Sequence, residues 1–131
     1  MIETQIRAIL VVDNTVKALV AARIYCGILP QNPVYPALTI QPITYNPDND
    51  LAGPGGLQWD RLQIDAWGST YAAADGLFKA VVDALNGKSF SGTGYRVGSV
   101  VVETGGGYGY EPSVGVHRRH FDIGVWYELS S

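Results

Sequence analysis

Apolar residues at helical spacing predict two short helices at the start of the chain. The first set consists of Ile2, Ile6, Ile9 and Leu10. It predicts an amphipathic helix over residues 2–12. The pair Asp13-Asn14 interrupts the pattern, because both side chains bond nearby backbone groups and favour caps and turns. A second set, Val16, Leu19 and Val20, predicts a shorter helical segment immediately afterwards.

Alternation of side chains predicts a strand with two unlike faces over Leu57–Gly68. One face carries Leu62, Ile64 and Ala66. The other face carries Trp59, Arg61, Gln63, Asp65 and Trp67. We expect the first face to contribute to the core and the second to point away from the helices.

The segment that follows carries the clearest helical pattern in the chain. Its apolar stripe consists of Ala74, Leu77, Phe78, Val81 and Leu85. Ser69 or Thr70 can cap its N-terminus, and Gly87 stands where a helix commonly ends, so we expect a helix to about Asn86.

Four other segments have the composition of strands. They are Arg23–Cys26, Ala37–Tyr45, Tyr95–Thr104 and Val114–Leu129. Pro42 in the second segment indicates an edge or a bulge, because proline cannot donate to a strand ladder. The last segment has two faces. One face carries Phe121, Ile123, Val125 and Tyr127, and the other carries Arg118, His120, Asp122 and Trp126.

Two Gly- and Pro-rich segments contain almost nothing that can pack, and we predict them to be solvent-facing arms. The first arm is Asn46–Gly56 and the second is Gly105–Ser113. Such long loops are uncommon in a small domain and tend to be functional or disordered. The element order predicts a single α+β domain over residues 1–131. We expect a mostly antiparallel four- to five-stranded sheet with the helices packed on one face and two long hairpin arms.

Composition and charge narrow the class of protein. The 131 residues are 47% hydrophobic and 16% charged, which is typical of a globular protein. The net charge is −3, and the longest Lys/Arg run is Arg118-Arg119, so a basic nucleic-acid domain is not indicated. Cys26 is the single cysteine, which excludes an internal disulfide, and we expect it to be buried. We recognise neither a signal peptide nor an apolar run of about 18 residues that could span a membrane.

We find no cofactor or metal site in the pattern. Gly105–Gly109 resembles a phosphate-binding loop, but such a loop needs a helix after it, and a strand follows here. His117 and His120 fall on opposite faces of a strand, which works against shared metal ligation.

A catalytic site is not indicated either. Asp65 and Asp122 could approach as a carboxylate pair, but no nucleophile, oxyanion device or third ligand accompanies them. We favour the interpretation that they are outer-face carboxylates or partners of Arg61 and Arg118. The alternative is a small enzyme that uses Asp65, Asp122 or His120.

The candidate contact residues combine the arms with the outer strand faces. Large aromatics on the helix-free face of a sheet are either covered by another layer or form a contact surface. Arg118 and Arg119 are either solvated or contact an acidic neighbour or a DNA phosphate. The candidates are Asp48, Asp50, Leu51, Trp59, Arg61, Trp67, Tyr108, Tyr110, Glu111, Arg118, Arg119 and Trp126.

An ordered set of segments resembles the tail completion, or tail terminator, proteins of siphophage type. The segments are Ile2–Leu10, Ala22–Gln31, Tyr35–Gln41, Leu62–Trp67, Thr70–Leu85, Tyr110–Pro112 and Arg118–Glu128. No single motif is specific, but the set covers nearly the whole chain in the family's order.

The resemblance implies a non-enzymatic virion protein that has no cofactor and is assembled in the host cytoplasm. It implies a ring, usually a hexamer, that caps the head-proximal end of the tail, ends tail-tube polymerisation and docks onto the head. The implied partners are copies of this chain, the major tail tube protein and the head connector, with DNA passing through the lumen without sequence-specific binding. Related proteins act instead as the neck ring that joins tail to head, and a monomeric ligand-binding domain is a more remote alternative.

Overall fold

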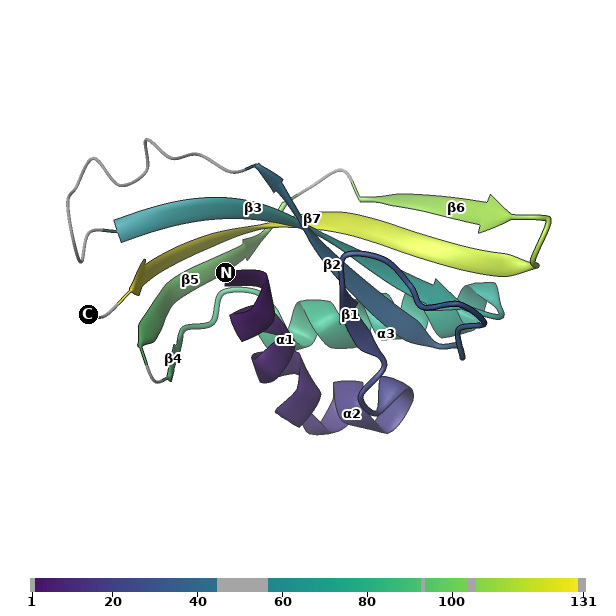
Figure 1. Cartoon of the computed structure of the whole chain (residues 1–131), viewed down its shortest axis with the longest axis horizontal. Coiled ribbons are helices and arrows are strands. Elements are labelled where there is room, and N and C mark those ends of the chain that lie inside the picture. Colours follow the sequence, from purple (N-terminus) through teal and green to yellow (C-terminus); the bar gives the residue numbers. More distant parts are fainter. Residues whose placement is uncertain (1, 45–56, 93, 104–105, 130–131) are drawn as a thin grey trace.

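A computed structural model describes residues 2–44, 57–92, 94–103 and 106–129, which form a seven-stranded sheet and three helices. The helices are α1 (Ile2–Val12), α2 (Asn14–Val20) and α3 (Tyr71–Leu85). The strands are β1 (Ile24–Cys26), β2 (Ala37–Thr44), β3 (Leu57–Gly68), β4 (Phe90–Gly92), β5 (Tyr95–Val102), β6 (Gly107–Glu111) and β7 (Val116–Leu129). All three helices lie against one face of the sheet (Figure 1).

The expected mostly antiparallel sheet of four to five strands is wrong. The sheet is mixed and has the order β1-β2-β3-β7-β5-β4, with β6 added alongside β7. β1 runs parallel to β2, with Ile24 opposite Leu38, because residues 27–36 carry the chain back before β2 begins. The other pairs are antiparallel. The two strands beyond the five expected segments, β4 and β6, lie in Gly-rich segments whose composition disfavours strands.

The second predicted arm is a β-hairpin. Gly107–Glu111 pairs along its whole length with the first residues of β7, from Glu111 opposite Val116 to Gly107 opposite His120. The chain reverses at a turn in which the Gly115 amide donates to the Glu111 carbonyl at 2.8 Å. Gly115 has φ 65°, which glycine adopts at no steric cost. The first arm, Asn46–Gly56, lies outside the described residues.

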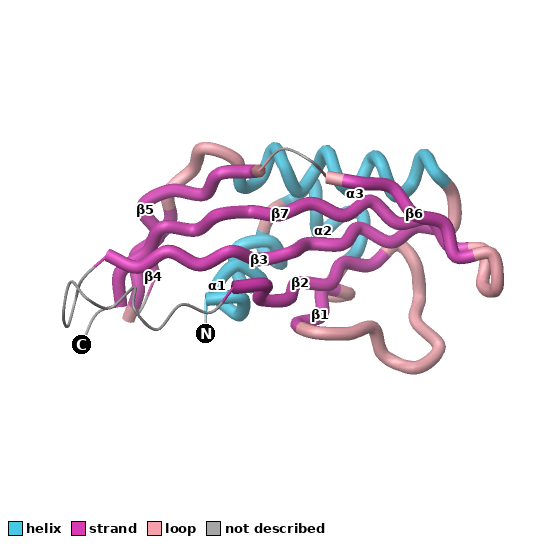
Figure 2. The backbone as a smooth tube through the Cα atoms, turned by 90° about the horizontal axis from the view of Figure 1, so that it is seen from above, coloured by secondary structure: helices cyan, strands magenta, loops and turns pink. Residues whose placement is uncertain are grey.

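β5 and β6 follow one another along the same side of β7. β5 pairs with the second half of β7, from Ile123 onward, and β6 pairs with the first half. Figure 2 shows the two strands nearly in line, with β3 on the other side of β7. β7 is therefore the central strand of the sheet, and its N-terminal part extends with β6 as a hairpin.

The core lies between the helices and the inner face of β3 and β7. Phe121, Ile123 and Val125 are buried on that face together with Leu62 and Ile64, as the alternating pattern predicts. Each large apolar side chain buried in this way contributes about 1.5–3 kcal/mol. Because this apolar layer must face the helices, it determines which alternate residues of β3 and β7 point inward and which point to the opposite side of the sheet.

The free end of β2 carries the predicted irregularity. Its pairing with β3 shifts in register between Pro42 and Thr44, where the sequence indicates an edge or a bulge. The Leu38 amide donates to Arg23, and the Ile40 carbonyl accepts from Gly27, so even-numbered residues of β2 turn their backbone groups toward β1. β1 ends before Pro42, and the proline removes an amide donor from this unpaired side, which protects the edge.

Thr70, rather than Ser69, caps α3. Its Oγ1 accepts a hydrogen bond from the Ala73 amide at 3.0 Å. We expect Thr70→Ala to lower the free energy of unfolding by about 1 kcal/mol, measured by urea denaturation. Ser69→Ala is the matched control, with a change within about 0.5 kcal/mol. Equal losses in the two variants would contradict this assignment.

Candidate interaction surface

The face of β3 and β7 that points away from the helices is called here the outer face. Its side chains are Trp59, Arg61, Gln63, Asp65 and Trp67 of β3 with Arg118, His120, Asp122 and Trp126 of β7. The antiparallel register places Trp59 opposite Trp126 and Trp67 opposite Arg118. The two polar patterns in the sequence therefore meet on a single surface.

Ion pairs cross this face between neighbouring strands. Arg61 Nε lies 3.2 Å from Asp122 Oδ2, and Arg96 Nη2 lies 3.3 Å from Glu128 Oε1. These pairs are partly exposed, and such pairs contribute at most about 1 kcal/mol each. Their main effect is to balance charge on the surface, because each of these guanidinium groups lies beside a carboxylate.

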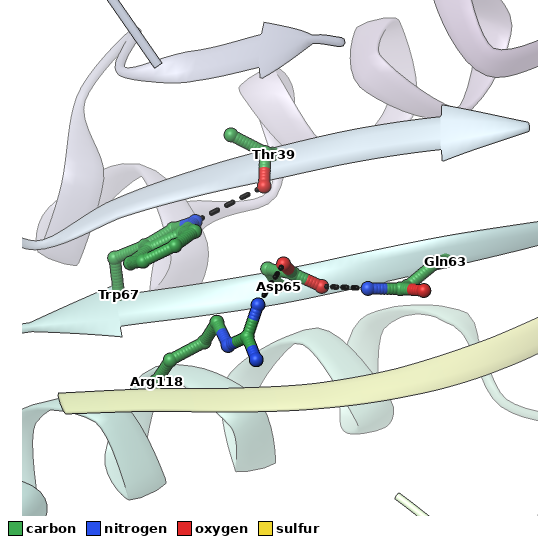
Figure 3. A network of polar contacts seen from close by, with 5 residues as sticks. All are labelled: Thr39, Gln63, Asp65, Trp67 and Arg118. Carbon is green, nitrogen blue, oxygen red and sulfur yellow. Dashed lines mark hydrogen bonds and ion pairs between the residues drawn. The ribbon is translucent and has the colours of Figure 1, made fainter. Parts of the chain in front are cut away.

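Asp65 forms the most buried ion pair of the outer face. It is only 2% exposed, and its Oδ2 lies 3.5 Å from Nη1 of Arg118. Its Oδ1 accepts a hydrogen bond from Gln63 Nε2 at 2.8 Å. Figure 3 shows the Asp65 carboxylate between these two donors. A buried carboxylate is costly unless it is paired and hydrogen-bonded, so both contacts are needed for this conformation.

Trp67 connects this ion pair to β2. Its Nε1 donates to Thr39 Oγ1 at 3.0 Å, and the Arg118 guanidinium lies over its ring, 5.5 Å from the centroid (Figure 3). The connection after β1 contributes Ile28 and neighbouring residues beside the network, where a cavity of about 290 Å³ remains. Strands β2, β3 and β7 thus jointly hold Asp65.

The carboxylates of the outer face are partners of arginines, as the favoured interpretation predicts. Asp122 pairs with Arg61, and Asp65 pairs with Arg118. The two aspartates lie on the same face, but the residue opposite Asp122 is Gln63 and the residue opposite Asp65 is His120. Each carboxylate is therefore neutralised by its own cation, which is not the arrangement of an acid/base pair.

Glycines allow the large outer-face side chains to lie close to the sheet. A Cβ atom at Gly124 would lie 2.8 Å from Trp59 Nε1, and one at Gly107 would lie 2.5 Å from His120 Nε2. Trp59 also lies against Trp126, with 6.2 Å between the ring centroids. Trp126 is 42% exposed and is the outermost of these aromatics, so it is available for contact with another chain.

The inner side of the β6–β7 hairpin packs against α3. The Tyr108 ring lies 5.1 Å from that of Tyr71, and the Tyr108 hydroxyl contacts Nδ1 of His117. The Tyr110 ring lies 4.7 Å from the His117 ring. Arg119 is beside them, 3.5 Å from Oδ1 of Asp75. These contacts attach the hairpin to the N-terminal part of the helix.

The candidate contact residues therefore do not form one surface. His117 and Arg119 lie on the inner side of β7, whereas Arg118 and His120 lie on the outer face, as their alternation predicts. Tyr108 and Tyr110 belong to a strand and lie on the same side as His117, and Glu111 ends that strand. The remaining candidates Asp48, Asp50 and Leu51 lie outside the described residues.

Two polar features were not predicted from the sequence. The hydroxyl of Tyr127 donates to Oδ2 of buried Asp60 at 2.8 Å on the inner face, where alternation alone indicated an apolar layer. Cys26 is exposed at the end of β1, so the expected burial is wrong. The pKa of the Cys26 thiol is raised, chiefly by partial desolvation and to a smaller extent by the nearby carboxylate of Glu3. A raised pKa leaves less reactive thiolate at neutral pH.

Comparison with known families gives the class of the protein. The family model for tail completion protein gp17 matches residues 4–128. The chain belongs to this family. It is accordingly a structural protein of a phage-type tail, in agreement with the resemblance of the ordered segments. A search of curated protein sequences finds no match.

A solved structure shares the fold of this tail completion protein. A chain from the virion of a native gene transfer agent particle superposes with a TM-score of 0.69. The two chains are 17% identical, and the match covers 94% of this chain and 91% of the other. At this identity the comparison establishes the fold alone.

Two further observations concern the described part of this tail completion protein. Within residues 2–44, 57–92, 94–103 and 106–129, no three His, Cys, Asp or Glu side chains gather in a way that could hold a metal ion. None of the helices in these ranges is long and apolar enough to cross a membrane.

Proposed function

We propose that this tail completion protein forms a ring, a hexamer, at the head-proximal end of the phage tail. The ring ends polymerisation of the tail tube and provides the surface onto which the head docks. The observation that carries the proposal is the family match over residues 4–128, which includes α2, α3, most of α1 and every strand residue except Leu129. The role is non-catalytic and belongs to the assembled virion.

The fold likeness to a chain of a gene transfer agent virion supports a place in an assembled particle. A ring requires two unlike surfaces on each subunit, because head-to-tail contacts close when the rotation closes. The projecting β6–β7 hairpin is one surface that a neighbouring subunit can contact, and the outer face, with its partly exposed tryptophan, is a further surface available for contact.

The paired charges of the outer face are compatible with a conduit for DNA. Affinity for DNA comes chiefly from cationic side chains that neutralise phosphates. Arg61 and Arg118 of this face, and Arg96 of the neighbouring β5, each have a carboxylate within 3.5 Å, so none of these three guanidinium groups lacks an acidic partner. A lumen lined by such a face would let DNA pass without holding it.

Electron microscopy of particles made without this protein tests the proposal. We expect overlong, headless tails, because tube growth is no longer stopped and the docking surface is missing. Headless tails of normal length would support instead a neck ring that joins tail to head. Normal-length tails attached to heads would contradict both roles. Supplying the intact protein in trans is the control and should restore infectious particles.

A further inference from the structure

An apolar groove lies between the end of α1, the end of α3 and β4. It encloses about 420 Å³, and its walls include Ile9, Val12, Ala84 and Phe90, with Lys88 at its border. Val12 is 73% exposed there, although it belongs to a helix whose other large apolar side chains pack on the core. A well-exposed aliphatic side chain beside an apolar groove marks a surface that another protein can cover.

The tip of the β6–β7 hairpin presents an exposed apolar side chain close to an acidic one. Val114 is 66% exposed at the turn, next to Glu111 at the end of β6. The Val114 and Gly115 amides both donate to the Glu111 carbonyl, at 3.2 and 2.8 Å, so the turn has a defined conformation. The packing of Tyr108 on Tyr71 holds the hairpin against α3. Little conformational entropy is then lost when the tip enters a partner.

The tip and the groove lie at opposite ends of the molecule. In Figure 1 the hairpin extends to the right along the longest axis, whereas β4 lies at the left, and Figure 2 agrees from above. A tip therefore cannot fill the groove of its own copy. It can fill the groove of the next copy, and contacts between such unlike patches are head-to-tail.

Charge complementarity favours a second copy as the occupant. The exposed carboxylate of Glu111 accompanies Val114, and the exposed amine of Lys88 borders the groove. Neither residue forms an ion pair within the part of the chain that the structure describes. Asp13, also at the groove, already accepts a hydrogen bond from the Val16 amide at 3.0 Å. An apolar centre with a charged pair at its rim is the usual composition of a protein interface.

We infer that the hairpin tip of one copy occupies this groove on the next copy, with Val114 among the apolar walls and Glu111 facing Lys88. The inference rests on the proposed ring and specifies the contact that closes it. The tip and groove are thus the two unlike patches that a head-to-tail ring requires.

Charge exchange across the contact tests the inference. Tail tubes of the same phage are titrated with the full chain, and ring assembly is followed by sedimentation and electron microscopy. We expect Glu111→Lys and Lys88→Glu each to raise the concentration for half-maximal assembly roughly tenfold, because like charges then face each other. The double exchange should return it to within about threefold of the unchanged protein. Failure of the pair to restore assembly would overturn the contact.

A second variant addresses the apolar part of the contact. Val114→Asp places a charge in the groove and should raise the assembly concentration at least about tenfold. Ile43→Asp is the matched control, since Ile43 is 46% exposed on β2, which β3 separates from β7 and the hairpin, and it does not line the groove, so it should leave assembly unchanged. Circular dichroism confirms that each variant folds. Rings that form equally well with Val114→Asp overturn this contact but leave the proposed ring intact, whereas absence of rings with unchanged protein overturns both.

Discussion

Replacing Phe121 by alanine is expected to lower the free energy of unfolding by about 3–5 kcal/mol, the range for truncating a buried phenylalanine. Phe121 is 1% exposed on the inner face of β7, where its ring packs edge-to-face on Phe78, with 4.9 Å between the centroids. The surrounding atoms belong to a sheet with partners on both sides of β7 and cannot close fully on the space that is left.

Urea denaturation of the isolated subunit measures this loss. Trp126→Ala is the matched control, because it truncates a large aromatic on the same strand but on the outer face, where the ring is 42% exposed. We expect the control to lose about 1 kcal/mol, mostly from its contact with Trp59. A comparable loss in both variants would show that the outer face is as tightly packed as the core, which contradicts the assignment of the two faces.

The sequence was sufficient to predict the elements whose two sides have different surroundings. β3, β7 and α3 each pack one side on the core, so their apolar residues recur with period 2 or at helical spacing. The cap of α3 was predictable within one residue, since Ser69 and Thr70 have nearly equal preference and only the Ala73 contact separates them.

The strand pairing was not predictable, because it depends on contacts far apart in the sequence. β6 has the sequence Gly-Tyr-Gly-Tyr-Glu, which lacks an apolar alternation and therefore predicts an arm rather than a strand. It is a strand because β7 offers it a ladder and because Tyr108 packs on Tyr71 of α3. The parallel direction of β1 similarly follows from the path of residues 27–36 and has no local signal.

The sequence predicts which residues belong to the outer face, but it does not predict how deeply each of them is buried. Alternation places Arg61, Asp65, Arg118 and Asp122 on one face, and their opposite charges predict ion pairs. The burial of Asp65 has no signal in the sequence. It arises because β2, which carries Thr39, and the connection after β1 both lie beside β3 and β7 at this position. The contact roles of the exposed residues, Trp126 above all, remain predictions.

Replacing Arg118 by alanine is expected to cost about 2–3 kcal/mol of the free energy of unfolding. The carboxylate of Asp65 is 2% exposed and would lose its cation while it keeps only the Gln63 hydrogen bond. Removing one partner of a fully buried pair costs about 3–5 kcal/mol, and the smaller value here reflects the 31% exposure of the Arg118 side chain, which admits water to the site.

A double-mutant cycle separates this cost from lost packing. Asp65→Asn retains the shape of the side chain and removes its charge, so adding it to Arg118→Ala should recover at least about 1 kcal/mol. Arg61→Ala is the control, because its pair with Asp122 is partly exposed on both sides and should change stability by at most about 1 kcal/mol. Strict additivity of the Asp65 and Arg118 variants would mean that Arg118 stabilises the sheet through its contact with the Trp67 ring rather than through the buried carboxylate.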